Sequence, residues 1–171
     1  MPRRSVVPAD SQTSAQKLGR RGPWIASVVV TVTVLSAGVW LAPSALADSV
    51  ANFKMALASA RSGTSCGPLR DNSVVEQVAE TINQLSDNYI NHNATQAPIE
   101  DPQVGLKDLG YGGNKGKQFQ GAAVSDGDAI KGALLEAYAA IPDCSYTDFG
   151  VSLRRNESSG YHLTVLVLAG P

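Results

Sequence analysis

The chain has few of the residues from which catalytic and metal sites are built. Its 171 residues include two cysteines and two histidines, and only 17% of the residues are charged. Two cysteines exclude a dense disulfide scaffold and a four-cysteine zinc site. A formal net charge of −1 excludes a strongly basic nucleic-acid binder, and 43% hydrophobic residues exclude a disordered chain. Length and composition together predict one globular domain preceded by a tail.

Charged side chains are absent from residues 22–47. Five basic side chains precede this stretch, residues 25–41 are almost wholly apolar, and the small residues Ala45 and Ala47 follow. A basic start, an apolar run and an A-x-A sequence are typical of a secretory signal peptide, so we expect cleavage after Ala47. A run of about 17 residues also reaches the lower length limit for crossing a bilayer. An uncleaved membrane anchor is therefore the alternative.

Removal of residues 1–47 changes the character of the remainder. Residues 48–171 carry fourteen acidic and nine basic side chains, a net charge of −5. An acidic domain does not suit a phosphate backbone, so no nucleic-acid partner is expected. Membrane contact is expected only through residues 25–41, if they are retained. In an oxidising compartment we expect Cys66 and Cys144 to form a disulfide, with two free buried thiols as the alternative.

Hydrophobic periodicity predicts an α+β domain over residues 48–171. Ser73 and Glu76 form a capping box, and Asp126 or Asp128 is expected to cap a later helix. The last strand is apolar on both faces, which indicates a central position in its sheet. The expected helices are 49–61, 73–91, 101–108 and 126–140, and the expected strands are 117–122, 149–155 and 161–168. The expected apolar faces of the three long helices are Val50, Phe53, Leu57 and Ala60; Val75, Val78, Ile82, Leu85 and Tyr89; and Ile130, Leu134, Leu135, Tyr138 and Ile141.

Three stretches follow, in order, a pattern known from one protein family. They are residues 58–80 (ASARSGTSCGPLRDNSVVEQVAE), 106–113 (LKDLGYGG) and 140–153 (AIPDCSYTDFGVSL). In these stretches the chain resembles the CAP superfamily of cysteine-rich secretory, antigen and pathogenesis-related proteins, in the short SCP-like form that bacteria export. The resemblance implies an α-β-α sandwich with a small antiparallel central sheet and three to four helices.

The resemblance also implies where a site would lie and what this chain lacks. Family members with an intact cleft can hold a divalent metal with two histidines and two acids. His92 follows the long helix, where the family often has a histidine, but the family's next acid is replaced within residues 116–120 and its second histidine by Cys144. Glu136 is the remaining candidate acid. One histidine and one carboxylate are too few for a zinc site, so no metal or cofactor is expected.

We therefore expect an exported, disulfide-stabilised binding or interaction module, secreted or held at the cell envelope. Its partner would be an apolar small molecule or lipid, as some relatives bind, or an envelope protein. The alternative is a hydrolase with a rebuilt cleft around His92 and Glu136, which requires both side chains to face one pocket. His162 lies on the last expected strand and is expected to pack beside Tyr161.

Overall fold

The computed structural model describes residues 44–171. The predictions of a basic start and an apolar signal or anchor segment at 25–41 lie outside these residues, and the predicted cleavage site falls on the first turn of the first helix. Four helices and four strands make up the described part. In chain order they are α1 Ser44–Ser62, β1 Arg70–Asp71, α2 Ser73–Ile90, α3 Gln103–Asp108, β2 Lys115–Ala123, α4 Asp126–Glu136, β3 Asp148–Arg155 and β4 His162–Gly170.

One sheet holds the four strands in the order β1-β3-β4-β2. β4 pairs antiparallel with β3 on one side and with β2 on the other, which confirms its predicted central position. The short strand β1 is parallel to β3 and was not expected from the sequence. The α+β class is confirmed, but the sheet is mixed rather than wholly antiparallel.

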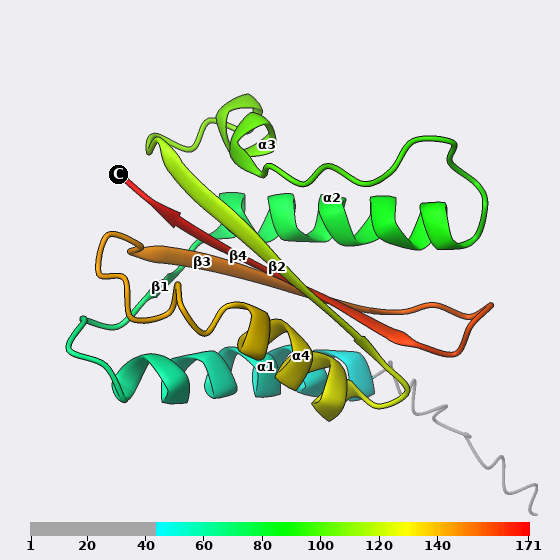
Figure 1. Cartoon of the computed structure of the whole chain (residues 1–171), viewed down its shortest axis with the longest axis horizontal. Helices are drawn as coiled ribbons and strands as arrows, with labels where there is room; N and C mark the ends of the chain where they lie inside the picture. The colour runs from blue at the N-terminus through cyan, green and yellow to red at the C-terminus, as the bar shows by residue number, and fades with distance from the viewer. Residues whose placement is uncertain (1–43) are drawn as a thin grey trace, which may run out of the picture. The chain divides into compact units, whose positions relative to one another are not determined.

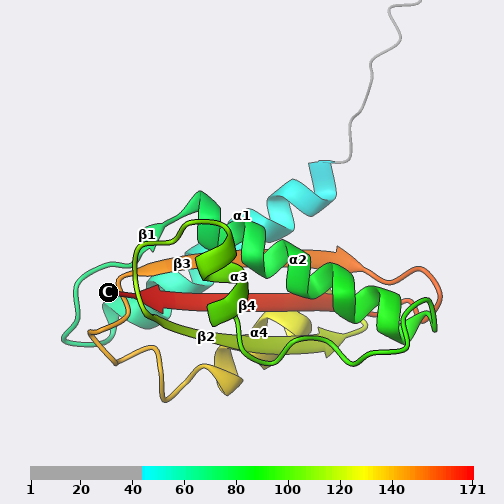
Figure 2. The ribbon, with the colours of Figure 1, turned by 90° about the horizontal axis from the view of Figure 1, so that it is seen from above.

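Helices cover both faces of this sheet, with α2 and α3 on one face and α1 and α4 on the other (Figures 1 and 2). β4 has apolar side chains on both faces, so a layer of helices is needed to cover each face of the sheet. Leu166 and Leu168 pack in a cluster with residues of α1 and α4, whereas Val165 and Val167 pack with α2 and α3. We call these the α1/α4 face and the α2/α3 face of the sheet.

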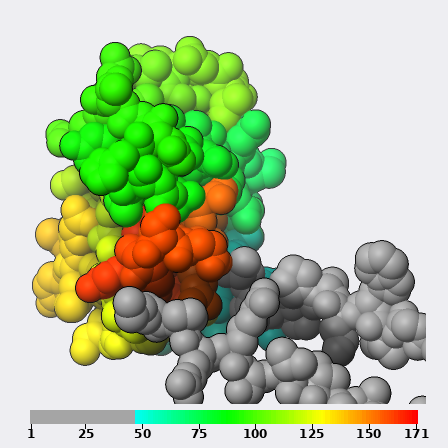
Figure 3. All heavy atoms as spheres, turned by 90° about the vertical axis from the view of Figure 1, so that its right-hand side faces the viewer, coloured from blue at the N-terminus to red at the C-terminus, as the bar shows by residue number. Residues whose placement is uncertain are grey.

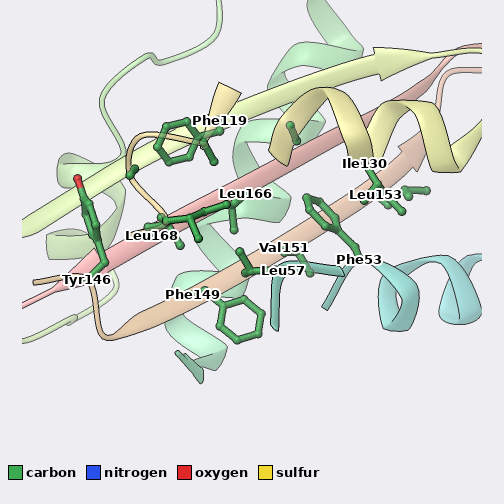
Figure 4. Packing of buried hydrophobic residues seen from close by; sticks show 14 residues of the cluster. Phe53, Leu57, Phe119, Ile130, Tyr146, Phe149, Val151, Leu153, Leu166 and Leu168 are labelled. Carbon is green, nitrogen blue, oxygen red and sulfur yellow. The ribbon is translucent and has the colours of Figure 1, made fainter. Parts of the chain in front are cut away.

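The larger core lies on the α1/α4 face (Figure 4). Phe53 and Leu57 from α1 belong to one cluster with Phe119 from β2 and Ile130 from α4, and all four side chains are buried. Burying a side chain of this size contributes about 1.5–3 kcal/mol to stability. The spacing of Phe53 and Leu57 predicted this stripe of α1. Ala60, which was expected to extend it, is exposed, and Arg61 is buried instead.

The helix caps differ from the predicted ones by one residue. Asn72, not Ser73, is the N-cap of α2, because its side chain accepts hydrogen bonds from the amides of Val74 and Val75. Ser125, not Asp126 or Asp128, caps α4 by accepting from the amide of Asp128. α4 also ends at residue 136 rather than 140.

A disulfide joins Cys66 and Cys144, as the sequence predicted, with Cα atoms 5.1 Å apart. It links the loop after α1 to the loop before β3. Arg61 binds the same two loops, because its guanidinium donates to the carbonyl oxygens of Gly67 and Tyr146, both at 2.9 Å. The two linkages fix the entrance to β3 and with it the position of Asp148.

Candidate functional site

A pocket with several polar side chains in its lining lies at the end of the sheet where β1, β3 and α2 begin. Its volume is about 490 Å³. The loop that follows α3, residues 110–113, forms one wall, and the first turn of α2 forms another. The side chains that give it chemical character are Arg70, Asn72, Tyr111, Thr147 and Asp148. We call it the Asp148 pocket.

The Asp148 carboxylate is the organising group of this pocket. The residue is only 3% exposed. Its Oδ2 atom accepts hydrogen bonds from Tyr111 Oη at 2.8 Å, Thr147 Oγ1 at 2.9 Å and Arg70 Nη2 at 3.0 Å. Burial alone would raise the pKa of Asp148, but these three donors together lower it below the ordinary aspartate value. Asp148 is therefore ionised at neutral pH and holds Arg70 and Tyr111 in place.

Tyr111 is held as a hydrogen-bond donor. Burial, and next the hydrogen bond to Asp148, raise the pKa of Tyr111 to about 12. The close approach of its ring explains one glycine of the loop: a Cβ on Gly113 would lie 2.6 Å from the ring and 2.1 Å from the carbonyl oxygen of Gly170. Gly110 has a positive φ of 81° and ends α3, as predicted.

Replacement of Asp148 by asparagine should destabilise the fold in a pH-dependent way. At pH 7 we expect Asp148→Asn to lower the free energy of unfolding by about 2 kcal/mol, because three donors lose a charged acceptor. A carboxylate whose native pKa is depressed stabilises above its unfolded pKa, near 3.9, and this contribution is lost as the pH falls through the native value. In urea unfolding, the difference in free energy of unfolding between wild type and Asp148→Asn should thus be smaller at pH 3 than at pH 7.

The exposed Glu157, whose side chain is 83% accessible, provides the control. Glu157→Gln should change the free energy of unfolding by less than about 0.5 kcal/mol at both pH values. A difference between wild type and Asp148→Asn that is the same at both pH values would contradict the assigned role of the carboxylate.

An apolar pocket adjoins the Asp148 pocket. It lies between α2 and α3 and has a volume of about 260 Å³. Val78, Ile82 and Leu85 of α2 form one wall, and Val104 and Leu109 lie on the other. The two pockets meet at consecutive positions: Leu109 lines the apolar pocket and the next residue, Gly110, lines the polar one. We call it the α2/α3 pocket.

The structure does not bring His92 and Glu136 together. His92 is exposed in the turn after α2, with a positive φ of 56°. Glu136 ends α4, and its carboxylate accepts a hydrogen bond from the backbone amide of Gln120 at the edge of the sheet. The end of α2 and α4 lie on opposite sides of the β3–β4 hairpin (Figure 3). The shared cleft that a hydrolase would need is not formed by these two residues.

His162 has a partner that the sequence did not reveal. Its Nδ1 atom lies against the carboxylate of Asp126, which also accepts from the hydroxyl of Ser49. Three elements, β4, α4 and α1, meet at this carboxylate. Asp126 was expected only as a helix cap, and no local pattern in the sequence signals that its partners lie 77 residues before it and near the end of the chain.

Neither a metal cluster nor a membrane span is present in residues 44–171. No three His, Cys, Asp or Glu side chains of this part converge on a point where they could hold a metal ion. None of its helices combines the length and the apolar character needed to cross a bilayer. The buried acid Asp148 is instead surrounded by donors, and no local pattern in the sequence signals this, because Arg70 and Tyr111 come from two distant segments.

No family model matches the chain, and no curated protein matches it by sequence. Solved structures do match its fold. A cysteine-rich secretory protein from Staphylococcus aureus aligns with 74% of this chain and 40% of its own length, at 12% identity and a TM-score of 0.57. An extracellular protein containing an SCP domain from Bacillus anthracis aligns with 77% and 44%, at 15% identity and a TM-score of 0.57.

An outer surface protein from Borrelia burgdorferi aligns with 72% of this chain and 92% of its own length, at 11% identity and a TM-score of 0.58. The chain thus spans less than half of the Staphylococcus and Bacillus proteins and most of the Borrelia protein. These likenesses, together with the element order and the disulfide, show that the chain has the α+β fold of the SCP-like, CAP-type domains found in secreted bacterial proteins.

Proposed function

We propose that residues 48–171 are an exported binding domain that takes up a small amphipathic molecule. The observation that carries this proposal is the proximity of two pockets, the Asp148 pocket with its fixed polar groups and the apolar α2/α3 pocket, which neighbouring residues of the chain line. Binding sites for small molecules combine apolar walls with a few fixed polar groups. The two pockets supply these features side by side along α2.

The polar end suits an anionic headgroup. Arg70 Nη2 binds Asp148, while the Arg70 side chain lines the pocket and is 75% exposed, which leaves its other N–H groups available to a ligand. A planar guanidinium pairs well with a carboxylate or a phosphate. The apolar end suits a hydrocarbon group, because Ile99, Val104 and Leu109 are 47%, 58% and 39% exposed around the α2/α3 pocket. Covering them would remove apolar surface from water.

Binding, rather than hydrolysis, fits the protonation chemistry of the site. A general acid or base works best with a pKa near the working pH. Tyr111 has its pKa raised to about 12, and Asp148 has its pKa lowered, so both keep one protonation state around neutrality. Glu136, the candidate acid of the hydrolase alternative, is used at the sheet edge.

Export is supported by three independent features. The first is the basic and apolar segment followed by Ala45 and Ala47. The second is the disulfide between Cys66 and Cys144, which persists in oxidising compartments. The third is the secreted, extracellular or outer-surface description of the structural neighbours. The proposed location is outside the cell or at its envelope.

A fluorescence titration with dansyl-labelled undecanoic acid tests the proposed site, because this probe joins a carboxylate to an apolar chain. Arg70→Gln and Val104→Asp should each weaken probe binding about tenfold, equivalent to losing one good polar or apolar contact. Leu135→Asp is the matched control, since Leu135 is 64% exposed on α4, away from both pockets. Binding should be unchanged in Leu135→Asp. Absence of binding, or equal weakening in all three variants, would reject the proposal.

Mass spectrometry of the protein secreted by its own host tests export, and one sample is measured under denaturing and then under native conditions. A denatured mass that begins at Asp48 and is two hydrogens short supports cleavage and the disulfide. An extra mass that is present only under native conditions would identify a carried ligand. An intact N-terminus would overturn the proposed cleavage and support the membrane anchor instead.

A further inference from the structure

β2 is an open edge of the sheet. It pairs with β4 on one side only, over residues 115–123. Lys117, Gln120 and Ala122 are exposed along it, whereas the outermost long strand on the other side, β3, is buried from Asp148 to Leu153. An exposed edge strand is a template for a further strand. Figure 2 shows β2 at the margin of the sheet, and α3 lies against its first residues, where a Cβ on Gly116 would be 2.5 Å from the side chain of Leu106.

One contact shows which backbone groups of β2 point outward. The amide of Gln120 donates to the Glu136 carboxylate rather than to β4. In an antiparallel ladder alternate residues direct their N–H and C=O groups to the same side. The groups of Gly116, Gln118 and Ala122 therefore point outward with those of Gln120. Within residues 44–171 this Glu136 contact is the one hydrogen bond made by these outward backbone groups.

Glu136 occupies the place that a carbonyl oxygen of another strand would take. Its carboxylate reaches the edge from α4, so it lies on the α1/α4 side of β2. Lys117 lies on the same side, because its ammonium is 5.4 Å from the ring centroid of the buried Phe119. No described residue forms an ion pair with Lys117. Lys115, two residues before Lys117 on the same side, already pairs with Asp143 at 2.7 Å. Lys117 and the Glu136 carboxylate are therefore the charges that this edge offers to another strand.

We propose that two copies of this chain pair through β2, antiparallel and in a register centred on Phe119. This register sets Gln118 opposite the partner's Gln120, and Gly116 opposite the partner's Ala122, so that outward groups meet outward groups. The Gln120 amide then donates to the carbonyl of the partner's Gln118, and Glu136 is released from it.

Charge complementarity selects a second copy as the occupant. With Gln118 opposite the partner's Gln120, the neighbouring Lys117 lies beside the partner's Glu136, and the two-fold axis repeats this ion pair. Lys117 itself lies opposite the partner's Gly121, so the two lysines stay apart. A charge on an edge strand ordinarily opposes further pairing. Here Lys117 and the partner's Glu136 carry opposite charges and neutralise each other across the two-fold axis. Gln118 and the partner's Gln120 face each other on the other side of the new sheet.

Sedimentation velocity over a concentration series tests the pairing with charge reversals. Lys117→Glu and Glu136→Lys should each raise the dimer dissociation constant at least about tenfold, because each places like charges together. The double variant Lys117→Glu/Glu136→Lys should return within about threefold of wild type, since the ion pairs are restored with reversed polarity. A wild type that is monomeric at all concentrations, or a dimer that the reversals leave unchanged, would overturn the proposal.

Ala122→Pro and Ala122→Ser form a matched pair at the edge itself. Proline removes an outward N–H and leaves the ladder to β4 intact, so it should abolish the dimer and keep the monomer folded. Serine keeps the N–H and should leave the dimer unchanged. Hydrogen exchange adds a local readout: the amides of Gln118 and Ala122 should become protected as concentration rises. Protection elsewhere, with these amides still exchanging freely, would assign the dimer to another surface and overturn the register.

Discussion

Replacing Arg61 by methionine should lower the free energy of unfolding by about 3–5 kcal/mol, as expected when a buried hydrogen-bonded charge network is broken. Arg61 is 3% exposed although it lies at the end of α1. Its guanidinium donates to the carbonyl oxygens of Gly67, Ile141, Asp143 and Tyr146. Burial lowers the pKa of Arg61, opposed by the charge of Asp143, but a guanidinium stays protonated in proteins. Methionine fills part of the space and removes the guanidinium from four carbonyl groups; that of Asp143 keeps the amide of Tyr146 as a donor.

Urea unfolding at neutral pH measures this effect. Arg61→Lys should recover less than half of the loss, because one ammonium cannot span four acceptors arranged around a planar fork. Arg155→Met is the control. The side chain of Arg155 is exposed, and its Nε atom lies 4.0 Å from Glu157 Oε1. Exposed ion pairs of this kind contribute at most about 1 kcal/mol to stability. Equal urea midpoints of unfolding for Arg61→Met and Arg155→Met would show that the buried guanidinium does not hold together the loop after α1 and the loop before β3.

The elements of the fold could be predicted where a local pattern determines them. β4 has apolar side chains on both faces and therefore must lie between two covered faces, which is where the structure places it. β1 could not be predicted, because two residues have no periodicity and pair with β3 only through tertiary contact. The caps were displaced by one residue because several neighbouring side chains can accept the first amides, and backbone geometry at Asn72 and Ser125 decides which of them does.

Apolar faces were overestimated at the ends of the helices. Tyr89, Leu135 and Tyr138 fit helical periodicity, yet they are 45%, 64% and 77% exposed. α4 ends before Tyr138, so the helical phase no longer applies there, and Tyr89 lies in the last turn of α2. Periodicity predicts a side chain's direction around the helix axis but not whether another element reaches that position.

The candidate site was less predictable than the fold because its groups come from distant segments. Asp148 becomes a buried acceptor only through Arg70 and Tyr111, which lie 78 and 37 positions away in the chain. Arg61 was missed for the same reason, since its acceptors include carbonyls about 80 residues later. Every residue has a backbone carbonyl, so the sequence does not show which carbonyls will accept hydrogen bonds from Arg61. The two residues singled out from family likeness, His92 and Glu136, were placed by order along the chain, and the sheet separates them.

Removing the disulfide should lower the free energy of unfolding by about 3–4 kcal/mol, which is close to the loss expected for Arg61→Met. Cys66 and Cys144 are 78 residues apart, and the loss of loop entropy in the unfolded chain gives about 4.5 kcal/mol as an upper value. The double variant Cys66→Ser/Cys144→Ser, measured by urea unfolding, should match wild type held in reductant. Wild type in reductant that is as stable as the oxidised protein would contradict this expectation.

The two linkages should also be coupled. Arg61 donates to Gly67 next to Cys66 and to Asp143 next to Cys144, so both linkages hold the same pair of loops. Combining Arg61→Met with the double serine variant should therefore cost less than the sum of the separate losses by at least about 0.5 kcal/mol, because loops already released by one change have less to lose by the other. Exact additivity would mean that the guanidinium and the disulfide act on independent parts of the fold, and that Asp148 is positioned by only one of them.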